Sequence, residues 1–192
     1  MIRRLYEWTM GLAETRYALL ALAFVAFIES SVFPIPPDIL MIPMILAAPR
    51  RAWLIAGIAT VSSVLGGLFG YYIGYALFDT VGRPVLEFYG KDAYFDDFAL
   101  RYNEWGAWAV LVAGVTPFPY KVITILSGST ALSLPVFMVA SVVARGLRFF
   151  IVAGLLWKFG PPIRDFIEKR LGLMFTLFVA LLLGGFYVVK FL

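Results

Sequence analysis

The chain has 192 residues, of which 62% are hydrophobic and 15% are charged, with a net charge of +4 and a mean hydropathy of +0.90. Soluble domains are closer to half apolar and a quarter charged, so we expect one integral membrane domain spanning residues 1–192. Because cysteine and histidine are absent, disulfides, Cys/His metal sites and imidazole catalysis are excluded. No dense basic run is present, so we expect no nucleic-acid partner. We also expect no metal or other cofactor.

The first apolar block, Tyr17–Ala48, follows the N-terminal sequence MIRRLYEW, which we expect to begin a membrane element and not a cleaved signal. The block is interrupted by Glu29, by a proline cluster and by Asp38. A re-entrant hairpin, broken by proline, would let this block enter the bilayer and return to the same side. The alternative makes Tyr17–Phe33 one full span and the following residues another. The predicted hairpin breakers are Pro34, Pro36 and Pro37.

The second block, Ala52–Phe78, is uncharged and long enough to span a bilayer. Within it the sequence GGLFGYYIGY places three glycines four residues apart, a spacing typical of close helix packing in membranes. These are Gly66, Gly70 and Gly74. The next segment, Asp79–Glu104, has six acids against three bases, with aromatic residues at helical spacing. We expect an amphipathic helix on the outer surface there.

The third block, Trp105–Trp157, contains a second interrupted stretch, VTPFPYKVITI, that matches VFPIPPDILMI of the first block. The match aligns Lys121 with Asp38, and the second pair of breakers is Pro117 and Pro119. Further along, Arg145 and Arg148 are three residues apart and therefore lie on one helix face. The last block predicts a final span over about residues 171–190.

A second match supports an internal repeat, since GRPVLEFYGK at 82–91 resembles GPPIRDFIEK at 160–169. We predict two units, at about 15–91 and about 105–170, each with a re-entrant helical hairpin and spanning helices. The fold would be an all-α, polytopic membrane protein with inverted-topology repeats, an architecture typical of secondary transporters. The distribution of Lys and Arg near span ends predicts a cytoplasmic N-terminus and an outer location for Asp79–Glu104.

Five charged residues lie at predicted membrane depth, where each would cost about 2.5–3.5 kcal/mol without a partner. They are Glu29, Asp38, Lys121, Arg145 and Arg148. We expect the two hairpin tips to form a buried Asp38–Lys121 pair or to line one wet cavity. The two arginines would either bind phosphate or serve as counter-ions for the two acids.

Glu29 has no counterpart in the second repeat, where the equivalent position is Val112. This asymmetry suits a carboxylate that takes up and releases a proton, although a protonated Glu29 bonded to a neighbouring helix fits equally well. Glu29 and Asp38 are therefore the candidate proton-coupling residues.

The ordered set ESSVFPIPPDILMIP, GGLFGYYIGY, TPFPYKVITILSG and ARGLRFF resembles the DedA family of bacterial membrane proteins, related to the SNARE-associated Golgi protein domain. The resemblance covers about residues 15–160 and is closest to the short branch with PFPYK in the second motif. It implies that the family's two acids are Glu29 and Asp38. Typical members have two arginines in the second hairpin. Here Lys121 replaces the later one and the earlier has no basic match near Val115, so Arg145 and Arg148 are the candidates to compensate.

The resemblance implies transfer of lipids between leaflets, including undecaprenyl phosphate recycling and phospholipid scrambling, often dependent on the proton gradient. We therefore expect a flippase- or scramblase-like lipid transporter in the bacterial inner membrane. Its partners would be membrane lipids, and the sequence leaves open whether the protein forms a homo-oligomer. The alternative is a secondary transporter of a small ion or solute through the same midplane site. An intramembrane enzyme is the weakest option, because clustered metal carboxylates, His and Cys are missing.

Overall fold

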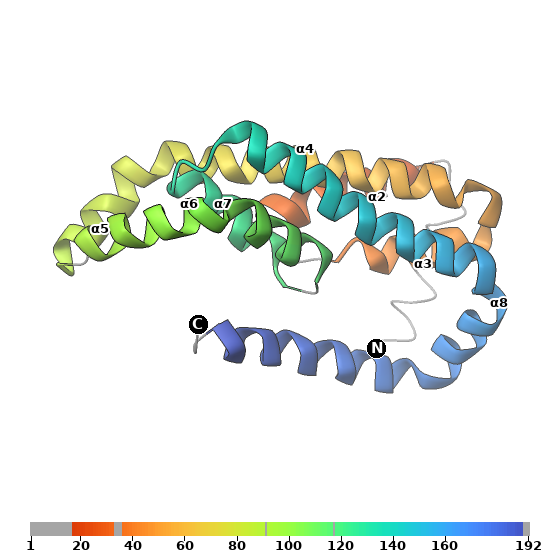
Figure 1. Cartoon of the computed structure of the whole chain (residues 1–192). Coiled ribbons are helices and arrows are strands. Elements are labelled where there is room, and N and C mark those ends of the chain that lie inside the picture. The colour runs from red at the N-terminus through yellow and green to blue at the C-terminus, as the bar shows by residue number, and fades with distance from the viewer. Residues whose placement is uncertain (1–16, 33–35, 91, 117, 190–192) are drawn as a thin grey trace.

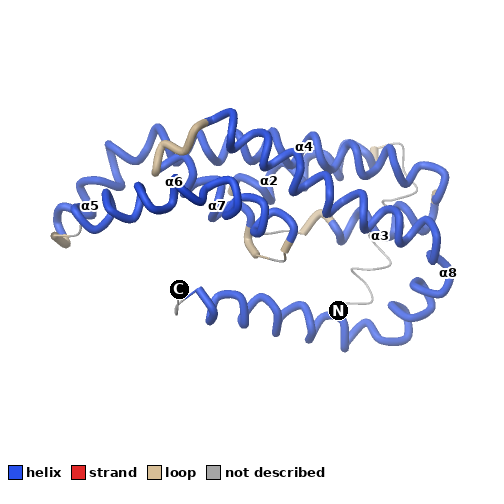
Figure 2. Tube along the Cα trace, viewed as in Figure 1, coloured by secondary structure: helices blue, strands red, loops and turns tan. Residues whose placement is uncertain are grey.

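The computed structural model describes the backbone of residues 17–32, 36–90, 92–116 and 118–189, and the side chains of these residues except 92, 161 and 163–189. Throughout these ranges the chain is helical between short turns, and no strand occurs in them (Figure 2). The all-helical prediction is confirmed for this part of the chain. The predicted N-terminal membrane element, Pro34 and Pro117 lie outside the described residues.

The first half of the chain forms a short hairpin followed by a long helical run. Helices α2 (Ala18–Ser31) and α3 (Asp38–Ala47) form the hairpin, and a 3-10 turn, η1 (Pro49–Arg51), leads into α4 (Ala52–Leu77). The run continues through a π-helical turn, η2 (Phe78–Gly82), into α5 (Arg83–Phe88). Pro37 is the N-cap of α3, a position next to the helix start where the missing N–H of proline costs no intrahelical bond.

The second half repeats this order with different lengths. Helices α6 (Asp92–Val115) and α7 (Tyr120–Ser129) form a second hairpin, and α8 (Leu134–Val189) follows. The α5–α6 turn and the bend where α8 turns back lie at opposite ends of the molecule (Figure 1). The prediction of a separate amphipathic surface helix within Asp79–Glu104 was wrong. Its residues from Asp92 onward form the first part of α6, and this helix continues into the apolar arm of the second hairpin.

The long helices carry the predicted apolar spans. Two described runs, Pro49–Phe88 and Leu134–Gly160, are long and apolar enough to cross a bilayer. Large apolar side chains such as Leu20, Phe24 and Val139 are about two-thirds exposed, which a soluble monomer rarely tolerates over a whole surface. The predicted final span lies inside α8, where only the backbone is described, so its spanning role stays a prediction.

Helix α4 is the central element, since it packs against α2, α7 and α8. Its glycines lie where α4 comes closest to the neighbouring helices α2 and α7. A Cβ on Gly66 would overlap the Phe27 carbonyl of α2, and a Cβ on Gly74 would overlap the Ile125 carbonyl of α7. The side chain of Thr124 occupies the space beside Gly70. The small residues therefore let three backbones meet without intervening side chains.

We expect Gly74→Ala to lower the thermal unfolding temperature of the purified protein, because the added methyl group must displace the α7 backbone at a cost of about 1–3 kcal/mol. Gly57→Ala is the matched control in the same helix, since a Cβ there meets nothing within 4 Å. This control should be neutral or slightly stabilising, because alanine favours helix over glycine by about 1 kcal/mol. Equal unfolding temperatures for the two variants would contradict the packing role of the ridge.

Candidate functional site

The candidate site lies where the two hairpins meet α8, and it is built from two carboxylate–arginine pairs. Glu29 is near the end of α2 and Asp38 is the first residue of α3, so both acids belong to the first hairpin. Arg145 and Arg148 lie one turn apart on α8. Arg145 Nη2 is 2.7 Å from Glu29 Oε2, and Arg148 Nη2 is 2.6 Å from Asp38 Oδ2.

The Glu29–Arg145 pair is deeply enclosed. The Arg145 side chain is 1% exposed and the Glu29 side chain 13% exposed. The guanidinium carbon of Arg145 lies 4.8 Å from the ring centroid of Tyr120 and 4.6 Å from that of Phe149. These aromatic faces add cation–π attraction to the ion pair and keep water away from it. The Tyr120 hydroxyl in turn donates to Ser141 Oγ at 2.5 Å.

Two serines complete the enclosure of this pair. Arg145 Nε donates to Ser63 Oγ of α4 at 2.6 Å, and Ser63 Oγ is 2.6 Å from Ser30 Oγ. Ser30 Oγ donates to Glu29 Oε2 at 3.1 Å. Because the Ser30 hydrogen is used for Glu29, Ser63 must donate to Ser30. The result is a closed ring of four side chains in which every hydroxyl both accepts and donates.

The Asp38–Arg148 pair is more open and reaches the second hairpin. Its side chains are 19% exposed for Arg148 and 20% exposed for Asp38. The other terminal nitrogen of Arg148, Nη1, donates to the Thr116 carbonyl at the end of α6, at 2.8 Å. One guanidinium therefore joins the first hairpin, the second hairpin and α8.

The predicted Asp38–Lys121 pair was wrong. Asp38 pairs with Arg148, while Lys121 Nζ donates to the Val32 carbonyl at the end of α2, at 3.1 Å. Two physical reasons favour this arrangement. The forked guanidinium of Arg148 can serve a carboxylate and a carbonyl together, and a lysine cation suits the negative end of a helix dipole. The hairpin tips do meet, since Lys121 of α7 contacts α2 and Thr124 Oγ1 donates to the Ser30 carbonyl at 3.0 Å.

Sequence reasoning therefore found all four ionisable residues of the two pairs, and its counter-ion alternative for the arginines matches the observed partners. It missed Ser30, Ser63 and Tyr120. Ser63 had a signal, because it lies three residues before Gly66 on the same face of an uncharged helix. The structure assigns no transport role to the predicted residues, so those roles stay predictions.

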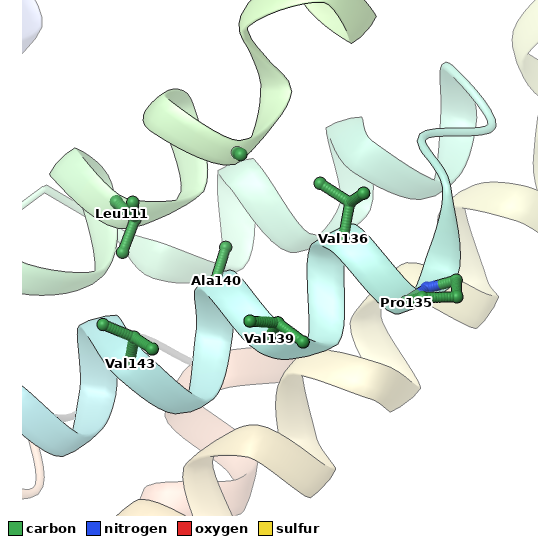
Figure 3. Close-up of a pocket in the computed structure, with 7 residues that line it drawn as sticks. Leu111, Pro135, Val136, Val139, Ala140 and Val143 are labelled. Carbon is green, nitrogen blue, oxygen red and sulfur yellow. The ribbon is translucent and has the colours of Figure 1, made fainter.

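An apolar groove of about 410 Å³ lies apart from this site, between α6 and α8 (Figure 3). Leu111 lines it from α6, and Val136, Val139 and Val143 line it from one face of α8. Arg145 is about half a turn away from Val143 around the helix, so it faces the other side of α8. Among the described side chains, no group of three or more His, Cys, Asp or Glu could hold a metal ion.

We expect Arg145→Gln to destabilise the protein by about 3–5 kcal/mol, because the variant leaves Glu29 as a buried charge without its counter-ion. The double variant Glu29→Gln with Arg145→Gln should recover part of this loss, since no charge then remains. Thermal unfolding in detergent measures both effects. Arg101→Gln breaks the exposed Asp97–Arg101 pair and is the control, with an expected loss below about 1 kcal/mol. A double variant no more stable than the single one would contradict the pairing argument.

Comparison with known proteins identifies sequence relatives and a family model. The chain is 37% identical over 168 residues to an uncharacterised protein of Haemophilus influenzae, covering 85% of this chain and 87% of the relative. It is 38% identical, with the same coverage, to an uncharacterised protein of Histophilus somni, and 24% identical to an uncharacterised membrane protein of Mycobacterium leprae over 70% of this chain and 62% of the relative. No solved structure matches. The family model of the VTT domain matches residues 35–158, and the chain therefore belongs to the VTT domain family, the DedA/SNARE-associated family.

Proposed function

We propose that the protein transfers a phosphate-bearing lipid, such as undecaprenyl phosphate or a phospholipid, between the leaflets of the bacterial inner membrane. The observation that carries this proposal is the pair of carboxylate–arginine contacts at the junction of two broken hairpins and α8. Four charges at bilayer depth would cost about 10–14 kcal/mol without partners, and such residues in membranes usually mark transport pathways. Arginine is also the side chain best suited to hold phosphate through parallel hydrogen bonds.

Proton coupling would act through Glu29 or Asp38. A carboxylate that takes up a proton loses its attraction for arginine, and the released guanidinium can then bind an anion. Membership in the VTT domain family supports a transporter and not an enzyme. The alternative is a secondary transporter of a small ion or solute that uses the same pairs.

Leaflet transfer in proteoliposomes tests this function. With fluorescent phospholipid in both leaflets, dithionite quenches about half of the label in protein-free vesicles, and the purified protein should raise this fraction. Glu29→Gln and Asp38→Asn identify the coupling residue, because loss of that carboxylate should make the transfer rate independent of pH. Ion flux without lipid transfer would favour the alternative, and unchanged quenching for phospholipid and undecaprenyl phosphate would contradict the proposal.

The proposed topology places both hairpins as re-entrant elements, with the N-terminus in the cytoplasm and repeats of inverted orientation. For the first hairpin, the lengths of 14 residues for α2 and 10 for α3 support re-entry, because these helices extend about 21 Å and about 15 Å, less than the roughly 30 Å hydrocarbon core. The repeated order of hairpin and long helix supports it as well.

Single cysteines can test the topology cleanly, since the natural sequence has none. An impermeant thiol reagent should label Asp96→Cys from outside the cell and Arg50→Cys only from inside. Val32→Cys, at the exposed end of α2, should resist the outside reagent if the hairpin is re-entrant. Labelling of Val32→Cys from outside as fast as Asp96→Cys would instead establish two full spans.

A further inference from the structure

The two ion pairs on α8 lie one turn apart but differ in how firmly they are held. Arg145 makes hydrogen bonds to Glu29 and Ser63 and lies between two aromatic rings, with 1% of its side chain exposed. Separating it from Glu29 would also open the ring of four side chains, because Ser63 loses a partner if Arg145 moves and Ser30 loses one if Glu29 moves. In a low-dielectric interior such a loss is costly unless every group finds a new partner.

Arg148 is arranged differently. Its Nη1 is fixed by the Thr116 carbonyl, a backbone group that does not depend on Asp38. Asp38 Oδ2 accepts one hydrogen bond from Arg148 Nη2, and both side chains are about one-fifth exposed. If the Asp38 carboxylate moved away, Arg148 would keep one hydrogen bond and its orientation. This guanidinium is therefore already positioned for another anion.

We propose that Asp38–Arg148 is the exchangeable half of the site, in which a phosphate group takes the place of the Asp38 carboxylate on Arg148. The Glu29–Arg145 pair stays closed during this exchange and holds α8 to α2 and α4. The inference rests on the proposed function and deepens it, because it names the anion-binding residue and the internal competitor. It also assigns Arg145 and Glu29 a positioning role, in contrast to the equal roles that the sequence suggested.

The geometry favours phosphate as the incoming anion. A phosphate oxygen can replace Oδ2 on Nη2 without disturbing Thr116, and its further oxygens can face the exposed side of the pair. A second cation, Lys121, lies at the same junction, where its amino group contacts the Val32 carbonyl at the end of the first hairpin. A free phosphate ion and a lipid headgroup share this chemistry, so the experiment must separate them.

Binding to the purified full chain in detergent, measured by calorimetry, tests the exchange. The probes are inorganic phosphate, dihexanoyl phosphatidic acid and dihexanoyl glycerol as the neutral partner. Asp38→Asn should tighten binding of the phosphatidic acid at least about tenfold, because the internal competitor is neutral while the side-chain shape is kept. Arg148→Gln should weaken it by at least about tenfold. Unchanged affinity in Asp38→Asn would overturn the exchange.

The control for charge is Arg101→Gln, which also removes one cation but lies in the exposed Asp97–Arg101 pair and leaves the Asp38–Arg148 pair intact. It should weaken binding less than threefold, and a loss as large as that of Arg148→Gln would overturn the assignment of Arg148. Should Arg148→Gln fail to fold, Arg148→Lys keeps the charge without the fork and should still lose several-fold in affinity. Retained full affinity in that variant would contradict the need for the guanidinium.

The probes also separate this inference from the proposed function. Tighter binding of phosphatidic acid than of inorganic phosphate, with no binding of dihexanoyl glycerol, supports both. Equal binding of the two phosphates with the expected Asp38→Asn effect supports the exchange but contradicts a lipid substrate. Lipid transfer by the wild type together with unchanged affinity in Asp38→Asn contradicts the exchange and leaves the transport function standing.

Discussion

The burial of Arg145 constrains the rest of this structure. An arginine cannot lose its charge in a protein, so a guanidinium that is 1% exposed needs a counter-ion and acceptors at fixed positions. Its counter-ion, Glu29, is 116 residues away in sequence, and its second acceptor, Ser63, belongs to a third helix. Helices α2, α4 and α8 must therefore approach closely at one level. The glycines of α4 make that approach sterically allowed for α2 and α7.

The proline-broken turns have a related role. Ending α2 and α6 within an apolar region leaves backbone carbonyls without intrahelical donors, which lipid cannot satisfy. The carbonyls of Val32 and Thr116 are two such groups, and they accept hydrogen bonds from Lys121 and Arg148 respectively. Lys121 of the second hairpin and Arg148 of α8, both predicted to lie at membrane depth, thus each satisfy a carbonyl that a break exposes. The two basic side chains therefore compensate for the hydrogen bonds that the proline breaks remove.

Much of the fold was predictable from local signals. The apolar blocks, the two interruptions and the glycine ridge each follow from residue types at short spacing. Helices α2, α3, α4 and α7 begin and end close to them, whereas α6 and α8 each run through more than one predicted segment. The partners of the charged residues were less predictable, because spacing within one hairpin says nothing about which distant helix packs against it. Repeat symmetry aligned Asp38 with Lys121 and suggested a pair. In the structure Asp38 instead pairs with Arg148 of α8, and no pattern in the sequence of α8 indicates that contact.

The distribution of charge also limits how the site can change. The first hairpin supplies both acids and α8 supplies both arginines, whereas the second hairpin contributes a carbonyl and a lysine. A motion that separated the two hairpins would have to break the contacts of Arg148 on at least one side, as well as that of Lys121. A motion confined to Asp38 would break one contact and leave the Glu29–Arg145 ring untouched. The motion of Asp38 alone disturbs fewer buried polar groups than the separation of the hairpins. The contacts therefore favour a small change at the start of α3.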